Sequence, residues 1–271
     1  VKKANTDQLR PVVNFTKLND NLKYEIYAIP RVTDVFQELS GSKWFSVLDV
    51  TSGFWNLPLD ESSKELCGIS THFGSYVYKA LPMGLHLSTS IFEEAMEETL
   101  GELKGHRILQ QVEEELVPTN KSRLLGSSCR NLVDDVTIYS KGTSEALQHL
   151  REVLERFRLF NWKAKPTKAK LLRQETTLLG HVVSDKGIKT DPEKVKALLQ
   201  RPEPTSREEV RSVTQAFGWY RAFIDSFAEL VGPMTELTKK KVKWQWSKEH
   251  SELYQKLKQA MANAPVLSYT D

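Results

Sequence analysis

Hydrophobic and polar positions follow two different periods along the chain, which predicts a mixed α and β fold. Residues 44–50 form an apolar run suited to a buried strand. A helix is predicted to begin at Ser90, because Ser90 and Glu93 have the spacing of a capping box and Gly105 can end the helix. Its predicted apolar face consists of Phe92, Met96, Thr99, Leu100 and Leu103.

The second half of the chain predicts more helix than strand. Thr143 can cap a helix. The apolar stripe of that helix consists of Leu147, Leu150, Leu154 and Phe157. Residues 177–184 have the pattern of a strand, and Asp191 followed by proline starts a short helix. Apolar residues then recur at helical spacing over 210–224, and a last helix begins at Ser247.

This change in patterning places a domain boundary near residue 190. Residues 1–190 are expected to form a mixed α/β part, and residues 191–271 a mostly helical part. Within the first part, residues 106–130 look like an insert, because the usual connection before a strand is only a few residues long.

The composition excludes several classes of protein. No apolar run approaches the roughly 18 residues needed to cross a bilayer, and the first ten residues lack a hydrophobic signal core. Cys67 and Cys129 are the only cysteines, which supports neither a disulfide framework nor a structural zinc site. A reducing, intracellular setting is therefore expected.

Charge is distributed unevenly along the chain. Residues 1–135 carry 14 basic and 19 acidic residues, a net charge of −5, whereas residues 136–271 carry 24 and 16, a net charge of +8. The densest basic stretch is Arg156–Arg173, and aromatic residues are interleaved with its cations. This mixture favours nucleic-acid binding through phosphate contacts and base stacking, although a plain solvated surface has the same composition.

Two neighbouring aspartates, Asp134 and Asp135, interrupt an apolar stretch that otherwise predicts a pair of strands. An unpaired buried carboxylate is costly, so two interpretations are open: a solvated hairpin tip, or carboxylates that hold divalent metal ions. Asp49 lies near the end of the apolar run at 44–50, where an acid is usually a turn former. Carboxylates from two strands can also meet at one sheet edge and hold two cations for phosphoryl transfer.

Several segments, taken in order, resemble the polymerase region of reverse transcriptases. The resemblance is closest to gypsy-type long-terminal-repeat retrotransposons and more distant to retroviruses. The segments are LRPVVNFTKLN (9–19), FSVLDVTSGFWNLPLDE (45–61), FGSYVYKALPMGLHLSTSIFEEAM (73–96), LVDD (132–135), LLGHVVSDKGIKTDPEKV (178–195), AFGWYRAFIDSFAEL (216–230) and APVLSYTD (264–271). The resemblance implies an α+β right-hand polymerase fold. It would comprise partial fingers and an antiparallel palm sheet backed by helices, then a helical thumb-like region and the start of the connection, without an RNase H domain.

The resemblance also implies roles for individual residues. The catalytic residues, which would bind two Mg²⁺ ions or Mn²⁺ in their place, are Asp49, Asp134 and Asp135. The nucleotide-binding residues would be Phe54, Met83, Gly84, Arg10 and Lys3, with Lys2 as an alternative to Lys3. Primer and template would contact Leu179, Gly180, His181 and, in the basic stretch, Lys163, Lys165 and Lys168. Without the family, Phe54 is equally well a core residue, His181 a surface residue beside a turn, and the cations ordinary solvated side chains.

The sequence departs from the family pattern at several positions. Leu132 stands where an aromatic residue is usual before X-Asp-Asp. Thr16 and Asn14 replace an arginine and an aspartate, which would remove an ion pair in the fingers. Residues 87–89 replace the usual Asn-Ala-Pro, and the insert at 106–130 could displace the strand that precedes the two aspartates.

Three functions follow from these observations. The first is an RNA-directed DNA polymerase, a nucleotidyltransferase that extends a DNA primer on an RNA or DNA template with deoxynucleoside triphosphates. The second is a retroelement-derived protein that binds nucleic acid but is catalytically silent. The third is a two-metal nuclease, which explains the acids but not Phe54 or residues 81–84. Expected partners exclude membranes and include flanking RNase H and integrase domains of a polyprotein, and the expected location is the cytoplasm or a virus-like particle.

Overall fold

The computed structural model describes residues 13–23, 31–132 and 134–269. Contacts divide the chain into two compact units, Val1–Arg173 and Gln174–Asp271. This division falls earlier than the change of pattern near residue 190, because a small sheet over 175–190 packs with the helices that follow it.

The first unit is built on a four-stranded antiparallel sheet. Its described elements are α1 (Thr16–Asn19), α2 (Val32–Glu38), β1 (Trp44–Asp49), η1 (Gly53–Asn56), α3 (Glu61–Leu66), β2 (Gly68–Thr71), β3 (Gly74–Val77), α4 (Ser88–Leu100), η2 (Arg107–Gln110), η3 (Glu114–Leu116), β4 (Cys129–Leu132), β5 (Asp135–Ser140), α5 (Thr143–Leu159) and β6 (Lys170–Arg173). The strand order is β4-β5-β1-β6, and β2 and β3 form a separate hairpin. The strand predicted over 44–50 is confirmed as β1.

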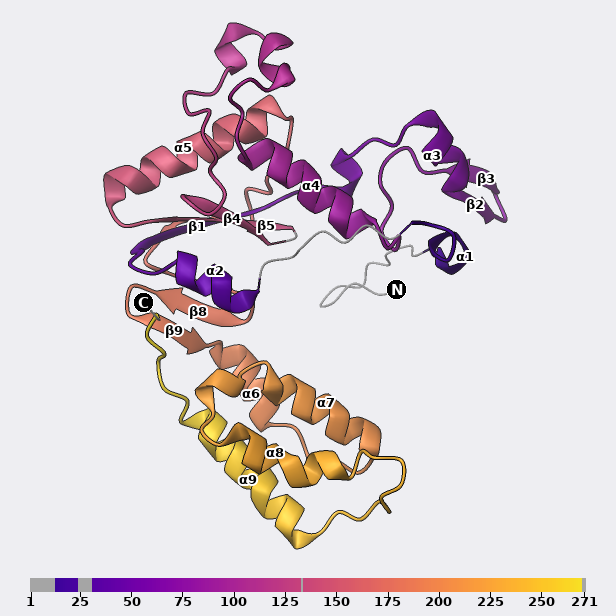
Figure 1. Cartoon of the computed structure of the whole chain (residues 1–271), viewed down its shortest axis with the longest axis vertical. Coiled ribbons are helices and arrows are strands. Elements are labelled where there is room, and N and C mark those ends of the chain that lie inside the picture. Colours follow the sequence, from indigo (N-terminus) through magenta and orange to yellow (C-terminus); the bar gives the residue numbers. More distant parts are fainter. Residues whose placement is uncertain (1–12, 24–30, 133, 270–271) are drawn as a thin grey trace. The chain divides into compact units, whose positions relative to one another are not determined.

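Helices cover both faces of this sheet (Figure 1). Helices α4 and α5 lie on one side, where their apolar residues pack on the strands. The buried cluster on that side includes Leu48, Val50, Phe92, Met96, Leu100, Val136, Ile138, Val153 and Phe157. Helix α2 lies on the other side, where Glu38 accepts hydrogen bonds from Arg130 on β4. The sheet is therefore held from both faces, which keeps the ends of β1 and β5 in fixed register.

The prediction for α4 is wrong at both ends. The helix begins at Ser88, before the expected cap, and ends at Leu100 rather than near Gly105. Glu93 is buried and accepts a hydrogen bond of 2.8 Å from Asn131 Nδ2 on β4. The Glu93 carboxylate, which the spacing predicted to cap the start of the helix, therefore binds a residue of a distant strand instead.

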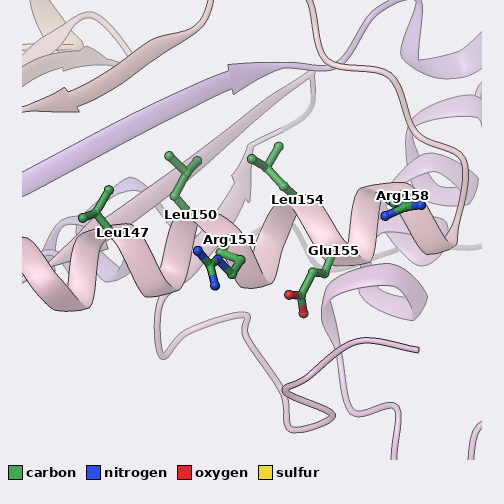
Figure 2. Close-up of a pocket in the computed structure, with 6 residues that line it drawn as sticks. All are labelled: Leu147, Leu150, Arg151, Leu154, Glu155 and Arg158. Atoms are coloured by element: carbon green, nitrogen blue, oxygen red, sulfur yellow. The ribbon is translucent and has the colours of Figure 1, made fainter. Parts of the chain in front are cut away.

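Only half of the stripe predicted on α5 is buried. Leu150 and Phe157 pack in the core, whereas the side chains of Leu147 and Leu154 are 54% and 43% exposed. Figure 2 shows Leu147, Leu150 and Leu154 along one side of the helix, beside Arg151 and Glu155. The apolar stripe is therefore wider than the surface that the sheet covers.

Within the predicted insert, the chain forms an excursion between Leu103 and Lys121 that projects from the fold. The excursion does not interrupt the pairing of β4 with β5. Its base is closed by a hydrogen bond of 2.8 Å from Leu103 N to Lys121 O. The short helices η2 and η3 lie between these residues, and Figure 1 shows this segment projecting beyond α5. The strands β4 and β5 pair without interruption from Cys129 opposite Ile138 to Leu132 opposite Asp135. The insert therefore does not displace the strand before the two aspartates.

A buried arginine fastens the base of this excursion to α5. Arg156 is 0% exposed. Its Nη1 donates to Thr99 O and Gly101 O at 3.5 and 3.3 Å. Its Nη2 donates to the backbone oxygens of Asn120 and Ser122, each at 2.8 Å. One guanidinium thus binds carbonyls from both ends of the excursion, a geometry that suits the planar fork of arginine.

The second unit combines a three-stranded antiparallel sheet with helices. Its described elements are β7 (Glu175–Leu178), β8 (His181–Ser184), β9 (Gly187–Thr190), α6 (Pro192–Leu199), α7 (Arg207–Gly218), η4 (Arg221–Phe223), α8 (Phe227–Glu236) and α9 (Lys248–Ala262). The predicted helix starts are confirmed for α6, whose N-cap Asp191 accepts from Glu193 N at 3.0 Å, and for α9, which follows Ser247.

The single strand predicted over 177–184 is wrong, because the chain turns back at Leu179 and Gly180. These residues have φ angles of +49° and +74°, and Leu178 pairs with His181 across the turn. A leucine at positive φ is unfavourable, so tertiary contacts must hold this turn.

Among the helices of the described residues, none is long and apolar enough to cross a membrane.

Candidate active site

The backbone places three aspartates, Asp49, Asp134 and Asp135, at one edge of the first unit's sheet. Asp49 at the end of β1 lies opposite Asp135 at the start of β5. Asp134 precedes β5, and its backbone oxygen accepts a hydrogen bond of 2.8 Å from Val50 N. Asp134 and Asp135 are exposed, and the side chain of Asp49 is 20% exposed. The Asp-Asp pair is therefore an exposed hairpin tip that lies beside Asp49, and its role as a metal site stays a prediction.

Mutual repulsion acts on these acids. The pKa of Asp135 is raised, first by partial burial and then by the negative charges of Asp49 and Asp134. The nearby cations Lys168 and Lys170 act in the opposite direction. A cation placed between the acids would relieve this repulsion.

The donor chemistry fits a hard divalent cation. Mg²⁺ is usually held by one or two carboxylates and keeps water or substrate phosphates as its other ligands. Within residues 13–23, 31–132 and 134–269, no three His, Cys, Asp or Glu side chains converge closely enough to hold a metal ion by themselves. The edge therefore fits an ion that takes one or two of these carboxylates and completes its coordination with substrate.

The basic stretch runs beside the carboxylates. Backbone hydrogen bonds of 2.6 Å from Thr51 N to Lys163 O and 2.9 Å from Lys165 N to Asp49 O attach it to the end of β1. The side chains of Lys163, Lys165 and Lys168 are exposed. Lys168 Nζ lies 2.6 Å from Asp49 Oδ2, and this contact raises the pKa of Lys168. The sequence alone gave no indication of the Lys168–Asp49 pair.

Phe54 lies close to the aspartates but in the core. It is on η1, and its ring centroid is 5.3 Å from that of Phe92 on α4. Gly53 permits this packing, because a Cβ atom there would lie 2.7 Å from the Phe92 ring and 3.3 Å from Asp134 Oδ1. Both expected surroundings of Phe54 are therefore combined, since it packs as a core residue beside the carboxylate edge.

Asn19 holds the segment that contains Met83 and Gly84, which is a contact that the sequence analysis missed. Its Nδ2 donates to Gly84 O, and its Oδ1 accepts from His86 N, each at 3.0 Å. Gly84 has a φ angle of +100°, a conformation that favours glycine, and Met83 is partly exposed. The predicted contacts Arg10, Lys3 and Lys2 lie outside the described residues.

Several departures from the family pattern have local partners in the structure. Asn14 Oδ1 accepts from Thr16 N at 2.9 Å and from its hydroxyl at 2.5 Å, so these two residues form a hydrogen-bonded start to α1. Ser88 Oγ, on the first residue of α4, donates to Pro82 O at 2.7 Å. Leu132 pairs with Asp135 on β5. The substituted residues therefore support the same backbone with different contacts.

In the second unit, aromatic side chains hold the turn at Leu179–His181. Trp219 Nε1 donates to Leu179 O at 3.0 Å, and the hydroxyl of Tyr220 donates to Gly180 O at 2.7 Å. His181 is buried and stacks on Phe223 with ring centroids 5.5 Å apart. The expectation that His181 is a surface residue is therefore wrong, because its ring packs in the aromatic cluster.

The stability of this second unit is expected to fall as the pH drops below about 6.5, the ordinary pKa of histidine. Burial lowers the pKa of His181. The hydrogen bond of its ring to Leu179 O and the negative charge of Asp191 act in the opposite direction and raise the pKa, but burial has the larger effect. The unfolded chain therefore binds a proton before the folded chain does, and stability is lost as the pH falls. Urea unfolding monitored by tryptophan fluorescence between pH 7.5 and 5.5 would measure the loss. An unchanged pH dependence in His181→Phe would contradict this assignment.

Comparisons with known proteins identify what this arrangement resembles. Residues 1–183 match the family model described as "Reverse transcriptase (RNA-dependent DNA polymerase)". The chain is 30% identical over 269 residues to the "Retrovirus-related Pol polyprotein from transposon 297" of Drosophila melanogaster, and this match covers 99% of the chain and 23% of the relative. It is also 30% identical over 274 residues to the "Retrovirus-related Pol polyprotein from transposon gypsy" of the same organism, covering 97% of the chain and 24% of the relative.

A solved structure shows the same fold. The foamy viral protease-reverse transcriptase in complex with double-stranded DNA has a TM-score of 0.84 and 21% sequence identity, and the match covers 100% of the chain and 44% of that protein. The implied α+β polymerase fold is thereby confirmed. The chain spans about a quarter of the length of the curated relatives it matches.

Proposed function

The chain belongs to the reverse transcriptase (RNA-dependent DNA polymerase) family, and on this premise we propose that it extends a DNA primer on an RNA template. The observation that carries the proposal is the meeting of Asp49, Asp134 and Asp135 at one end of the β1–β5 pair. Acids on two paired strands, next to a basic segment, fit nucleotidyl transfer from a deoxynucleoside triphosphate.

Divalent metal ions are used throughout this family, and we propose two Mg²⁺ ions here, with Mn²⁺ as an alternative. When bound, such ions neutralise charge on the reacting phosphate oxygens and favour ionisation of the primer hydroxyl. Asp49 and Asp135 supply the ligands from opposite strands, and Asp134 completes the acidic edge. Hydrogen bonds to the main-chain oxygens of Asp49 and Asp134 hold the backbone from which these carboxylates project.

The residues around the acids have binding and positioning roles in this proposal. Gly84 and Met83 line the nucleotide site, where the absence of a side chain on Gly84 allows close approach. Phe54, whose ring packs on Phe92, would form the inner wall of this site and exclude a 2′-hydroxyl. The exposed amines of Lys163 and Lys165 face solvent beside the carboxylates, where they would bind backbone phosphates. Arg10, with Lys3 or Lys2, would bind the triphosphate.

Two successive parts of the chain, which differ in their bounds from the two compact units, fit different parts of a polymerase. We assign residues 1–190 to partial fingers and palm, and residues 191–271 to a helical thumb-like region that ends at the start of the connection. The turn at Leu179–His181, which two aromatic donors hold rigidly, would contact the end of the primer. We also propose flanking RNase H and integrase domains and a location in the cytoplasm or a virus-like particle, a proposal supported by the similarity to Pol polyproteins.

Primer extension tests the proposal directly. A labelled DNA primer annealed to an RNA template is incubated with Mg²⁺ and the four deoxynucleoside triphosphates, beside an Asp134→Asn/Asp135→Asn double variant. Extension by the wild type and none by the variant is expected, because asparagine keeps the shape of each side chain but removes its charge. Primer-template binding by both proteins without extension by either would instead support a catalytically silent nucleic-acid-binding protein.

A further inference from the structure

The side chain of Lys168 is a cation that contacts the carboxylate edge directly. Its Nζ lies 2.6 Å from Asp49 Oδ2, within the range of a strong charge-assisted hydrogen bond. The two side chains differ in exposure: that of Lys168 is 57% exposed, whereas that of Asp49 is 20% exposed. The lysine can therefore leave more easily than the aspartate can move.

Main-chain hydrogen bonds join the segment that carries Lys168 to the backbone at Asp49. Asp49 O accepts from Lys165 N at 2.9 Å, and Val50 forms an isolated bridge with Ala164. Lys168 lies in the turn that follows, where its N donates to Lys165 O at 3.1 Å. The segment that contains Lys168 is thus hydrogen-bonded to the backbone of Asp49. The fold itself therefore brings the two side chains together.

We propose that Lys168 neutralises Asp49 when no metal is bound and competes with divalent cations for the same carboxylate oxygen. This inference rests on the proposed function, because it takes Asp49 as a metal ligand. An ammonium that donates to Oδ2 occupies the lone pair that a hard cation needs, so one must displace the other or share the oxygen. Because the side chain of Asp49 is the more buried of the two, the competition is resolved by movement of the flexible lysine stem.

Two consequences distinguish this role from a general effect of positive charge. Removing the ammonium exposes Asp49, Asp134 and Asp135 to their mutual repulsion, so the metal-free protein becomes less stable. The same change frees Asp49 Oδ2, so divalent cations bind more tightly. A lysine elsewhere on the segment, such as Lys163, has no described contact with an aspartate and should affect neither property strongly.

The test measures Mn²⁺ binding by electron paramagnetic resonance of the free ion, without substrate. Lys168→Met, which keeps the length of the side chain but removes its charge, is compared with the wild type and with Lys163→Met. The Kd of Lys168→Met for Mn²⁺ is expected to fall about three- to fivefold, the effect of a partly exposed ion pair. Lys163→Met should remain within about twofold, and Lys168→Arg should restore the wild-type value. Thermal unfolding should show a larger gain in Tm on Mg²⁺ addition for Lys168→Met than for the wild type.

Different results would refute the inference alone or the inference together with the proposed function. If the wild type binds Mn²⁺ at a site that Asp134→Asn/Asp135→Asn removes, and Lys168→Met binds with equal or lower affinity, the inference is wrong and the proposed function stands. An equal fall in the Kd for Mn²⁺ in Lys163→Met and Lys168→Met would also overturn the inference. The loss of any nearby positive charge would then explain the effect. Absence of any Mn²⁺ binding that depends on the aspartates would overturn both the inference and the proposed function.

Discussion

Replacing Asp49 with asparagine is expected to slow primer extension by about 10³-fold while leaving primer-template affinity within about twofold, because the lost charge acts on the reacting phosphates rather than on the bound duplex. Asp49 lies opposite Asp135 in the strand register, so its charge contributes to the same edge of the sheet. Asparagine preserves the hydrogen bond from Lys165 N, which involves only the backbone oxygen. The local structure should therefore survive the substitution.

Single-turnover extension and fluorescence anisotropy of a labelled primer-template would separate the two effects. Asp34→Asn is a matched control, because Asp34 is an exposed acid on α2 of the same unit. It should extend primers at the wild-type rate. An Asp49→Asn protein that retained more than about a tenth of the wild-type rate would contradict a catalytic role for this residue.

Replacing Arg156 with methionine is expected to lower the free energy of unfolding of the first unit by about 3 kcal/mol. Methionine keeps most of the aliphatic stem but leaves four backbone carbonyls without their shared donor. Those of Asn120 and Ser122 lie at the return of the excursion, so its base should loosen first. Burial also lowers the pKa of Arg156.

Urea unfolding monitored by circular dichroism would measure this loss, and limited proteolysis would report on the excursion. Arg158→Met provides the control, because Arg158 is exposed on the same helix and the change removes the same charge. Its unfolding free energy should change by less than about 0.5 kcal/mol. Equal stability of the Arg156 and Arg158 variants would show that the excursion is held by other contacts.

The sequence alone determined much about this protein. The order and spacing of its motifs placed the chain in the reverse transcriptase family and predicted its α+β class, both of which are confirmed. It also selected Asp49, Asp134 and Asp135, which the fold brings to one sheet edge. These inferences succeed because a resemblance rests on motifs of fixed residue type and order, which can be recognised along the chain without knowing how it packs.

Only the tertiary structure decided which partners these residues have. Lys168 and Asp49 are 119 residues apart, and Asn131 and Glu93 are 38 apart, so no local pattern could pair them. The same holds for Arg156, which is the first residue of the basic stretch in the sequence and is buried at the base of the excursion in the fold. Such contacts depend on how distant segments pack, because burial changes both the cost of a charge and the partners that can reach it.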